Sequence, residues 1–301
     1  MKKTKHHASL SLESLISKAA LSPLSSIGPV VHKVMAILRN PASSATELKE
    51  MIEVDPPLCS QVLRRANSAY YGIRRDISSI QEAIVFIGFN AVTELALSLK
   101  VGKIFEQEHK VGGYSRKALW KHSLAVALCC KYIYRREFRE RGDDIYSTAL
   151  LHDLGIIAEE QFMPNAFADL IERCVSENAS LPKIEEELFG YTHAGVGQRL
   201  ASHWRLPAEM TAAIMHHEKP PSILPPGAKQ SRPALTVCIA NYACIRAGFS
   251  CCEPPLPPVI EEGKYEEALA QLQIPKRALE LIITEVQGEL KQLQENGELY
   301  L

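Results

Sequence analysis

The chain has 301 residues, of which 46% are hydrophobic and 23% are charged, and its formal net charge is −1. These values are typical of one large or two modest globular domains, and a near-neutral chain is atypical of a dedicated nucleic-acid binder. No apolar run is long enough to span a bilayer, so we expect no membrane segment. The eight cysteines include no C-x-x-C pair, which fits a reducing, cytoplasmic compartment better than a disulfide framework.

The first hundred residues carry helix signals with short turns between them. Residues 1–20 start with positive charges but lack the apolar stretch of a secretory signal, so we expect a loose tail. Ser79, with a glutamate three residues later, forms a capping box that opens a helix, and we expect Thr46 and Asn90 to cap two more. Because no segment shows sustained period-two alternation, the region 21–108 is predicted to be all-helical.

Two segments of this region are distinctive, namely DPPLCSQVLRRANSAYYG and ISSIQEAIVFIGFNAV. With their surroundings they resemble the N-terminal half of HDOD domains, the HD-related output domains of bacterial signalling proteins, and the resemblance extends from Ser22 to about His217. It implies an all-α, multi-helical fold of the HD superfamily and a role in bacterial signal transduction. Within an HDOD domain over 21–217 we expect two helical lobes, at 21–108 and 109–217. A C-terminal helical region over 218–301 would complete the second lobe.

The second lobe sets isolated polar residues into apolar segments. His122 falls on the apolar side of a long predicted helix and is expected to face the interior. The run 145–158 is predicted to be one helix, with His152 and Asp153 at its centre. A buried carboxylate needs a cation, a hydrogen-bond network or a metal. An isolated His-Asp pair is more often a core histidine beside an aspartate at a wet rim, so the pair is informative only together with the rest of the chain.

Further histidines follow on predicted helices. Thr192 is expected to cap a helix that carries His193 in its first turn, and the next helix ends at His216 and His217. A helix dipole favours positive charge near its C-terminus, so an electrostatic role is an alternative for this last pair. Asn241 interrupts another apolar helix.

Imidazoles combined with a carboxylate suit Fe, Mn, Ni or Zn, and a carboxylate such as Asp153 can bridge two metals. The order of these residues resembles the ligand series of HD-GYP phosphodiesterases, relatives of HDOD proteins that hydrolyse cyclic dinucleotides. The resemblance implies one or two transition-metal ions in a single pocket, with these candidate ligands: His122, His152, Asp153, His193, His216, His217 and Asn241.

Three features depart from the active enzymes. Asn241 stands where the superfamily has its closing Asp, so a charged ligand becomes a neutral amide. Ile156 stands where the enzymes read H-D-x-G-K, which removes a cation that would bind phosphate or protonate a leaving oxygen. The sequence KPPSILPPG replaces the GYP-containing loop after the two final histidines. Each lost source of charge stabilisation costs on the order of a hundredfold or more in rate.

The sequence therefore favours a non-catalytic signalling or interaction module whose degenerate pocket is structural, ligand-sensing or metal-holding. The alternative is a metal-dependent phosphohydrolase or cyclic-nucleotide phosphodiesterase in which Asp153 and His152 take part in catalysis. Signalling proteins are the expected partners, a nucleotide is an alternative ligand, and nucleic acid is disfavoured. Pro275 divides the C-terminal region into two predicted helices. The second is amphipathic and is expected to pack on the body of the protein or, as the weaker option, to contact a partner or a second copy in a homodimer.

Overall fold

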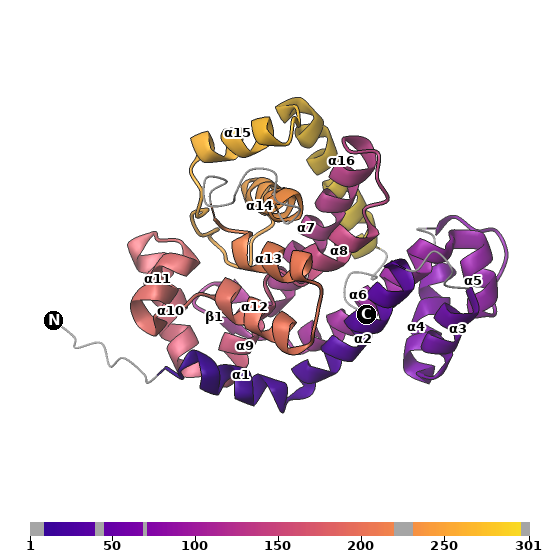
Figure 1. Ribbon diagram of the computed structural model, residues 1–301, viewed down its shortest axis with the longest axis horizontal. Helices are drawn as coiled ribbons and strands as arrows, with labels where there is room; N and C mark the ends of the chain where they lie inside the picture. Colours follow the sequence, from indigo (N-terminus) through magenta and orange to yellow (C-terminus); the bar gives the residue numbers. More distant parts are fainter. Residues whose placement is uncertain (1–8, 40–44, 69–70, 220–230, 296–301) are drawn as a thin grey trace.

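The computed structural model describes residues 9–39, 45–68, 71–219 and 231–295. Within these ranges the chain is almost entirely helical, as Figure 1 shows. The sheet found there is a two-stranded antiparallel hairpin of β1 (Lys110–Val111) and β2 (Tyr114–Ser115). The all-α prediction is confirmed. The buried hydrophobic residues form one continuous cluster through both halves of the chain, and the lobe boundaries stay a prediction.

Local signals predicted some helix starts of the first half correctly and others wrongly. Ser79 caps α5 as predicted, because its hydroxyl accepts a hydrogen bond from the Glu82 amide at 3.1 Å. Thr46 lies inside α3 (Ala45–Glu53) and Asn90 lies inside α6 (Phe89–Gly102), so neither is the predicted cap. The Asn90 amide instead donates to the Asp143 carboxylate at 2.8 Å. The elements of this half are α1 (Leu12–Ala20), η1 (Pro23–Ser26), α2 (Ile27–Arg39), α3 (Ala45–Glu53), α4 (Pro56–Ala66), α5 (Ile80–Ile87), α6 (Phe89–Gly102) and η3 (Lys103–Phe105).

The first helix corrects the expectation of a loose tail over residues 1–20. Ser11 caps α1, and the apolar face of the helix buries Leu15 and Ala19 completely. This face packs on α9 (Leu154–Phe162) and α12 (His193–His203), while residues 1–8 lie outside the described ranges. No single helix in the described residues is long and apolar enough to cross a membrane. Only α1 and the helical stretch after it reach that length together, with a 65° bend between them.

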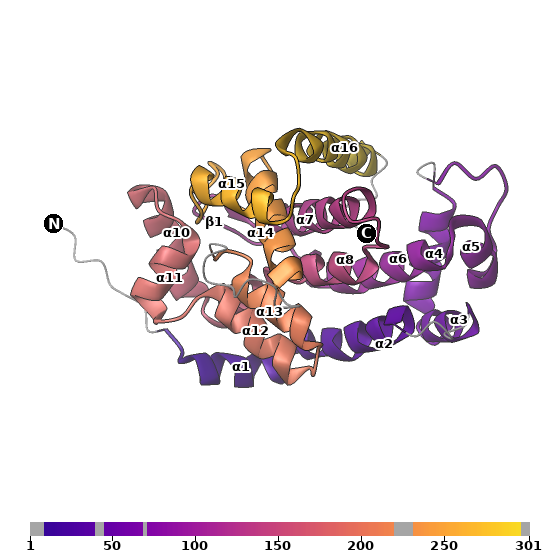
Figure 2. The same cartoon turned by 45° about the horizontal axis from the view of Figure 1, so that its top comes forward.

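The second half surrounds one long helix, α7 (Arg116–Arg136), which contacts α8 (Asp143–Leu150), α14 (Ser231–Arg246) and α16 (Lys276–Glu295). The predicted single helix over 145–158 is wrong, because the chain forms α8 and α9 with a turn at 151–153 between them. The C-terminal helices separate at Pro275 as predicted, and α16 buries its apolar side against α7 (Figures 1 and 2). The remaining helices are α7 (Arg116–Arg136), α8 (Asp143–Leu150), α10 (Pro164–Glu177), α11 (Leu181–Phe189), α13 (Ala208–His216), α14 (Ser231–Arg246), α15 (Glu262–Gln271) and α16 (Lys276–Glu295).

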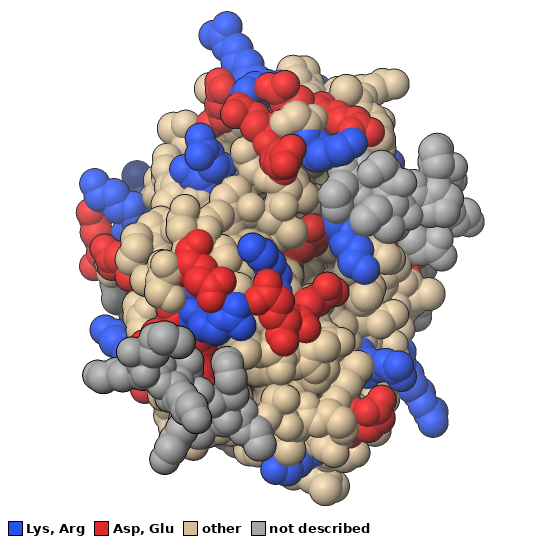
Figure 3. All heavy atoms as spheres, turned by 90° about the vertical axis from the view of Figure 1, so that its left-hand side faces the viewer, with Lys and Arg blue, Asp and Glu red and all other residues tan. Residues whose placement is uncertain are grey.

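The outer face near α10 and α11 carries charges of both signs. Arg173 of α10 pairs with Glu177 at 2.8 Å and with Glu187 of α11 at 2.5 Å. Figure 3, which looks onto this side of the molecule, shows acidic and basic side chains interspersed over an otherwise uncharged surface. No basic stripe of the kind that follows a nucleic-acid backbone is visible on this face of the described residues.

Candidate metal centre

Five of the predicted ligands meet around one buried carboxylate. His122 comes from the middle of α7, and His152 and Asp153 come from the turn after α8. His193 lies in the first turn of α12, where Thr192 caps the helix as predicted, and His217 directly follows α13. Each of the five ligand residues is at most 7% exposed. The structure therefore brings five of the seven predicted residues together, and their role as metal ligands stays a prediction.

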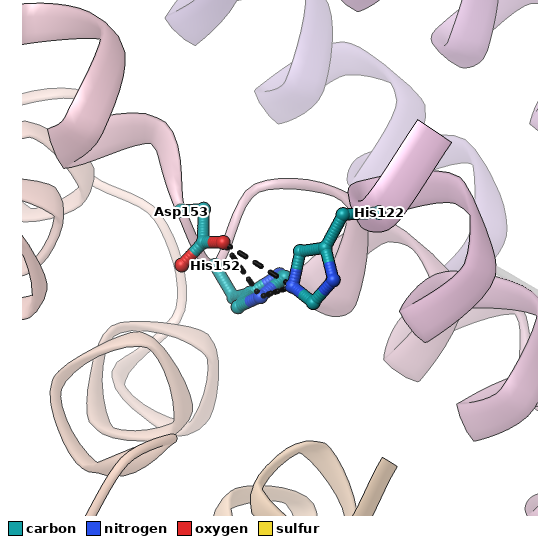
Figure 4. A group of neighbouring side chains, drawn as sticks. All are labelled: His122, His152 and Asp153. Atoms are coloured by element: carbon teal, nitrogen blue, oxygen red, sulfur yellow. Dashed lines mark hydrogen bonds and ion pairs between the residues drawn. The ribbon is translucent and has the colours of Figure 1, made fainter. Parts of the chain in front are cut away.

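Each oxygen of Asp153 faces two imidazoles. Oδ2 lies 3.4 Å from Nε2 of His122 and 3.2 Å from Nε2 of His152, as Figure 4 shows for this group. Oδ1 lies 3.5 Å from Nε2 of His193 and 3.3 Å from Nε2 of His217. Within each pair the two Nε2 atoms are 3.3 Å and 3.4 Å apart. Donors bonded to one tetrahedral metal ion at about 2.1 Å lie about 3.4 Å from one another, so both groups have suitable spacing.

The tautomers of all four imidazoles are fixed by hydrogen bonds on the far side of each ring. Nδ1 donates in every case, from His122 to the Phe249 carbonyl (2.9 Å), from His152 to Ala149 (2.6 Å), from His217 to Ile214 (2.6 Å) and from His193 to the Glu185 carboxylate (2.8 Å). Because a carbonyl or carboxylate oxygen can only accept, Nδ1 carries a proton in each ring, and Nε2 is the ring nitrogen that faces Asp153. Metal-binding histidines are held in the same way.

The electrostatics of the cluster require a positive charge at its centre. Burial lowers the pKa of His152 to about 4, so this ring is neutral at pH 7. Burial alone would raise the pKa of Asp153, but the surrounding imidazoles hold that pKa well below its usual range. Nε2 of the neutral His152 ring and the ionised carboxylate then face each other with lone pairs, which repel. Protons or a metal ion must lie between them, and a metal ion accepts several such lone pairs at once.

Two carboxylates of the site were missed in the sequence. Glu185 of α11 is completely buried and accepts hydrogen bonds from both Nδ1 and the backbone amide of His193. Glu218 directly follows His217, and its Oε2 lies 3.4 Å from His193 Nε2. Burial alone would lower the pKa of His193, but Glu185 and Glu218 hold it well above its usual range. The adjacent histidines were a usable signal for Glu218, whereas nothing in the sequence pointed to Glu185.

The two other predicted ligands behave differently. His216 is half-buried and belongs to neither group of potential metal donors found among the described residues. Asn241 lines the pocket from α14, and its Oδ1 is buried with no hydrogen-bond partner among the described residues. Asn241 therefore offers the pocket a neutral acceptor, while His216 lies outside the Asp153 cluster.

The cavity beside the cluster is small, about 60 Å³, and has an apolar outer wall. Ile156, at the position discussed above for the missing lysine, is part of this wall, as are Leu181 and Tyr242 and the segment 256–260. Among the described residues that line the cavity, none is a lysine or an arginine. The donor set thus fits one or two transition-metal ions, and the described lining places no lysine or arginine beside them.

Known proteins with related sequences or structures support this assignment of the fold. A curated protein of Treponema pallidum (strain Nichols), described as uncharacterized, is 24% identical over 215 residues, which is 69% of this chain and 40% of that protein. An HDOD domain protein of unknown function from Geobacter sulfurreducens has 23% identity and a TM-score of 0.74, covering 97% of this chain and 100% of its own.

Two further solved structures share the fold at similar identity. A candidate signal transduction protein of Marinobacter aquaeolei VT8 has 21% identity and a TM-score of 0.73, covering 100% of this chain and 64% of its own. A candidate phosphohydrolase of Shewanella amazonensis SB2B has 21% identity and a TM-score of 0.68, covering 94% and 97%. The model of the HDOD domain family matches residues 24–220. This match confirms the resemblance predicted from the sequence, and the chain belongs to the HDOD domain family.

Proposed function

We propose that this chain is a signalling module of the bacterial cytoplasm that holds one or two transition-metal ions at the Asp153 cluster and hydrolyses no phosphodiester. One observation carries the proposal: four imidazoles of fixed tautomer direct Nε2 at the two oxygens of a single buried carboxylate. Fe, Mn, Ni and Zn all accept this combination of donors. A bound ion supplies positive charge and Lewis acidity at this point.

The pocket around the cluster argues against hydrolysis. The transition state of phosphodiester cleavage gathers negative charge and is stabilised by nearby cations. The described pocket residues include no lysine or arginine, and Ile156 contributes an apolar side chain. Glu218 adds a carboxylate within 3.4 Å of His193 instead. The described lining of this pocket thus gives an anionic substrate no lysine or arginine as a binding partner.

The role in signalling is inferred from the family and from the place of the cluster in the fold. The chain belongs to the HDOD family, whose name denotes output domains of signalling proteins. The candidate signal transduction protein of Marinobacter aquaeolei shares this fold. The ligand residues come from α7, the turn at 151–153, α12 and the end of α13. Metal occupancy would fix these elements relative to one another and with them the surface that the module offers to a partner protein.

A metal-dependent phosphohydrolase is the second candidate. Two donor groups that share a bridging carboxylate are the arrangement used in two-metal hydrolases, and the similar structure from Shewanella amazonensis is a candidate phosphohydrolase. In this alternative Asp153 and His152 would belong to the catalytic centre.

Elemental analysis of freshly purified protein tests the proposal. Asp153→Ala removes the shared carboxylate, and Asp76→Ala is a matched control at an exposed aspartate. We expect transition metal in the wild type and in Asp76→Ala. In Asp153→Ala the metal content should be at least about tenfold lower. If the wild type stays metal-free after incubation with Fe, Mn, Ni and Zn salts, both candidate functions are refuted.

The metal-loaded protein is then assayed with bis(p-nitrophenyl) phosphate, a generic phosphodiester. The proposal predicts no turnover above the metal salt alone. Turnover that Asp153→Ala loses and Asp76→Ala keeps would instead establish the hydrolase.

A further inference from the structure

A second cavity lies between the two halves of the molecule and shares no lining residue with the metal pocket. Its volume is about 230 Å³, and its walls come mainly from α6, α7 and α16. Helix α6 packs on α2 and α8, whereas α7 packs on α8, α14 and α16. The two helices therefore leave a space between them, which η3 and the C-terminal part of α16 border.

One part of the wall is apolar and buried. Leu99 of α6 and Leu124 and Leu128 of α7 line the space together with the rings of Phe105 and Trp120. The centroids of these two rings are 5.1 Å apart and the rings are tilted by 34°. Protein interiors leave few voids larger than a water molecule, and an apolar cavity of about 150 Å³ is sufficient to bind benzene. The present cavity is therefore large enough for an aromatic molecule of one or two rings.

One side of the cavity offers a hydrogen-bond acceptor. Glu94 of α6 is 8% exposed and lines the cavity, and Lys131 donates to its Oε2. Its Oε1 has no hydrogen-bond partner among the described residues, and the Arg135 guanidinium lies 3.9 Å from it. Burial raises the pKa of this carboxyl to about 7. Nearby, the hydroxyls of Ser98 and Tyr146 bond to each other at 2.8 Å, whereas Oε1 of Glu94 is a buried acceptor without a hydrogen bond among the described residues.

The charges of the lining residues balance. The described lining contains three basic and three acidic residues, namely Arg65, Lys117 and Lys131 against Glu94, Glu106 and Glu289. A lining without excess charge favours a neutral ligand, because a charged one would lose its hydration without a matching counter-charge.

We propose that this cavity binds a neutral aromatic molecule of one or two rings that carries an N–H or O–H donor. The rings contact Trp120 and the leucines, and the donor bonds to Glu94. Because the walls come from α6 in the first half and α7 in the second, the bound molecule joins both halves of the fold. This site acts independently of the metal cluster.

Fluorine NMR of the full chain labelled with fluorotryptophan tests the proposal, with indole as the probe. The chain has two tryptophans, Trp120 in the cavity and Trp204 beside Gly28 of α2, and Trp204→Phe assigns their signals. We expect indole to shift the Trp120 signal saturably and to leave Trp204 unchanged. 1-Methylindole, which lacks the N–H donor, should bind about tenfold more weakly.

A variant that fills the cavity gives the second arm. Ala91→Phe places a ring on the cavity wall, and Ala270→Phe is the same change at an exposed position of α15. Ala91→Phe should weaken indole binding at least about tenfold, and Ala270→Phe should leave it unchanged. If Ala91→Phe does not fold, Gly102→Ala narrows the space more gently, because its new methyl would lie 3.2 Å from the Trp120 ring.

The proposal is overturned by any of three results. Indole binding that does not saturate up to about 1 mM would show that the cavity is not a specific binding site. Equal shifts of both tryptophan signals, or binding unchanged in the cavity-filling variant, would place the ligand elsewhere. Equal affinity for indole and 1-methylindole would refute the proposed hydrogen bond from the ligand N–H to Glu94.

Discussion

Gly155 decides how closely α9 approaches α12, and its replacement gives the sharpest test of the site geometry. A Cβ atom at Gly155 would lie 2.0 Å from the carbonyl oxygen of His193 and 3.0 Å from its Cα. Real Cβ contacts are essentially never shorter than 3.0 Å, and the atoms in the way belong to the backbone, so no side-chain rotation relieves the clash. In Gly155→Ala the two helices must separate by roughly 1 Å.

The cost follows from this displacement. Overpacking a well-filled interior costs about 1–3 kcal/mol, and we expect about 3 kcal/mol here because a backbone segment has to move. For a chain of 301 residues this free energy lowers the melting temperature by about 5 °C. His193 moves with the backbone of α12 and away from Asp153, so metal affinity should also fall about tenfold or more.

Gly195→Ala on α12, the helix that carries His193, is the matched control. Its added Cβ would meet only the Thr192 hydroxyl, at 4.0 Å, and an alanine inside a helix is favoured over glycine by about 0.5–1 kcal/mol. Scanning calorimetry and metal analysis of both variants are the measurements. If Gly155→Ala melts and binds metal like the wild type, the contact between α9 and α12 does not position His193.

Three other changes have defined outcomes. His217→Ala should reduce metal content about tenfold or more, whereas His216→Ala should keep it, and equal loss in elemental analysis would contradict the geometry. Glu160→Gln breaks a buried ion pair with Arg116 and should cost about 3–5 kcal/mol in denaturant unfolding, so a loss below about 1 kcal/mol would be evidence against it. Burial raises the pKa of Glu94 from 4.5 to about 7 in the folded state, so its contribution to stability is full below pH 4.5 and is lost as pH rises through 7. The unfolding free energy should therefore fall by up to about 3 kcal/mol over this pH range. In urea unfolding from pH 4 to 8, Glu94→Gln should lack this part of the pH dependence.

Helix boundaries were predictable from the sequence where neighbouring residues decide them. Ser79 and Thr192 bond to amides three residues ahead, and Pro275 lacks the amide that a continuing helix needs. Asn90 failed as a predicted cap because Asp143, 53 residues away in the chain, binds its side chain instead. The first helix was missed for a similar reason, since α9 and α12 cover its apolar face.

The residues that offer donor atoms to a metal were predictable from the sequence, but the residues that hold them in place by hydrogen bonds were not. The family resemblance predicted that these imidazoles lie in one pocket, although they are far apart in sequence. Glu185, which fixes the tautomer of His193, sits on a separate helix eight residues earlier and looks like any glutamate of an amphipathic helix. Only the fold of α11 against α12 shows that its carboxylate points inward to an imidazole and not to water.

Two predictions excluded each other, the continuous helix over 145–158 and the cluster that contains both His152 and Asp153. Two pairs of adjacent residues show why. Successive residues of an α-helix point about 100° apart, so neighbours in a helix rarely reach the same atom. At the end of α13 only His217 reaches Asp153, and His216 does not. His152 and Asp153 are also adjacent, yet both belong to the cluster, because residues 151–153 form a turn between α8 and α9. A continuous helix over 145–158 would have turned one of these two side chains away, so the break in that helix is what allows the centre to form.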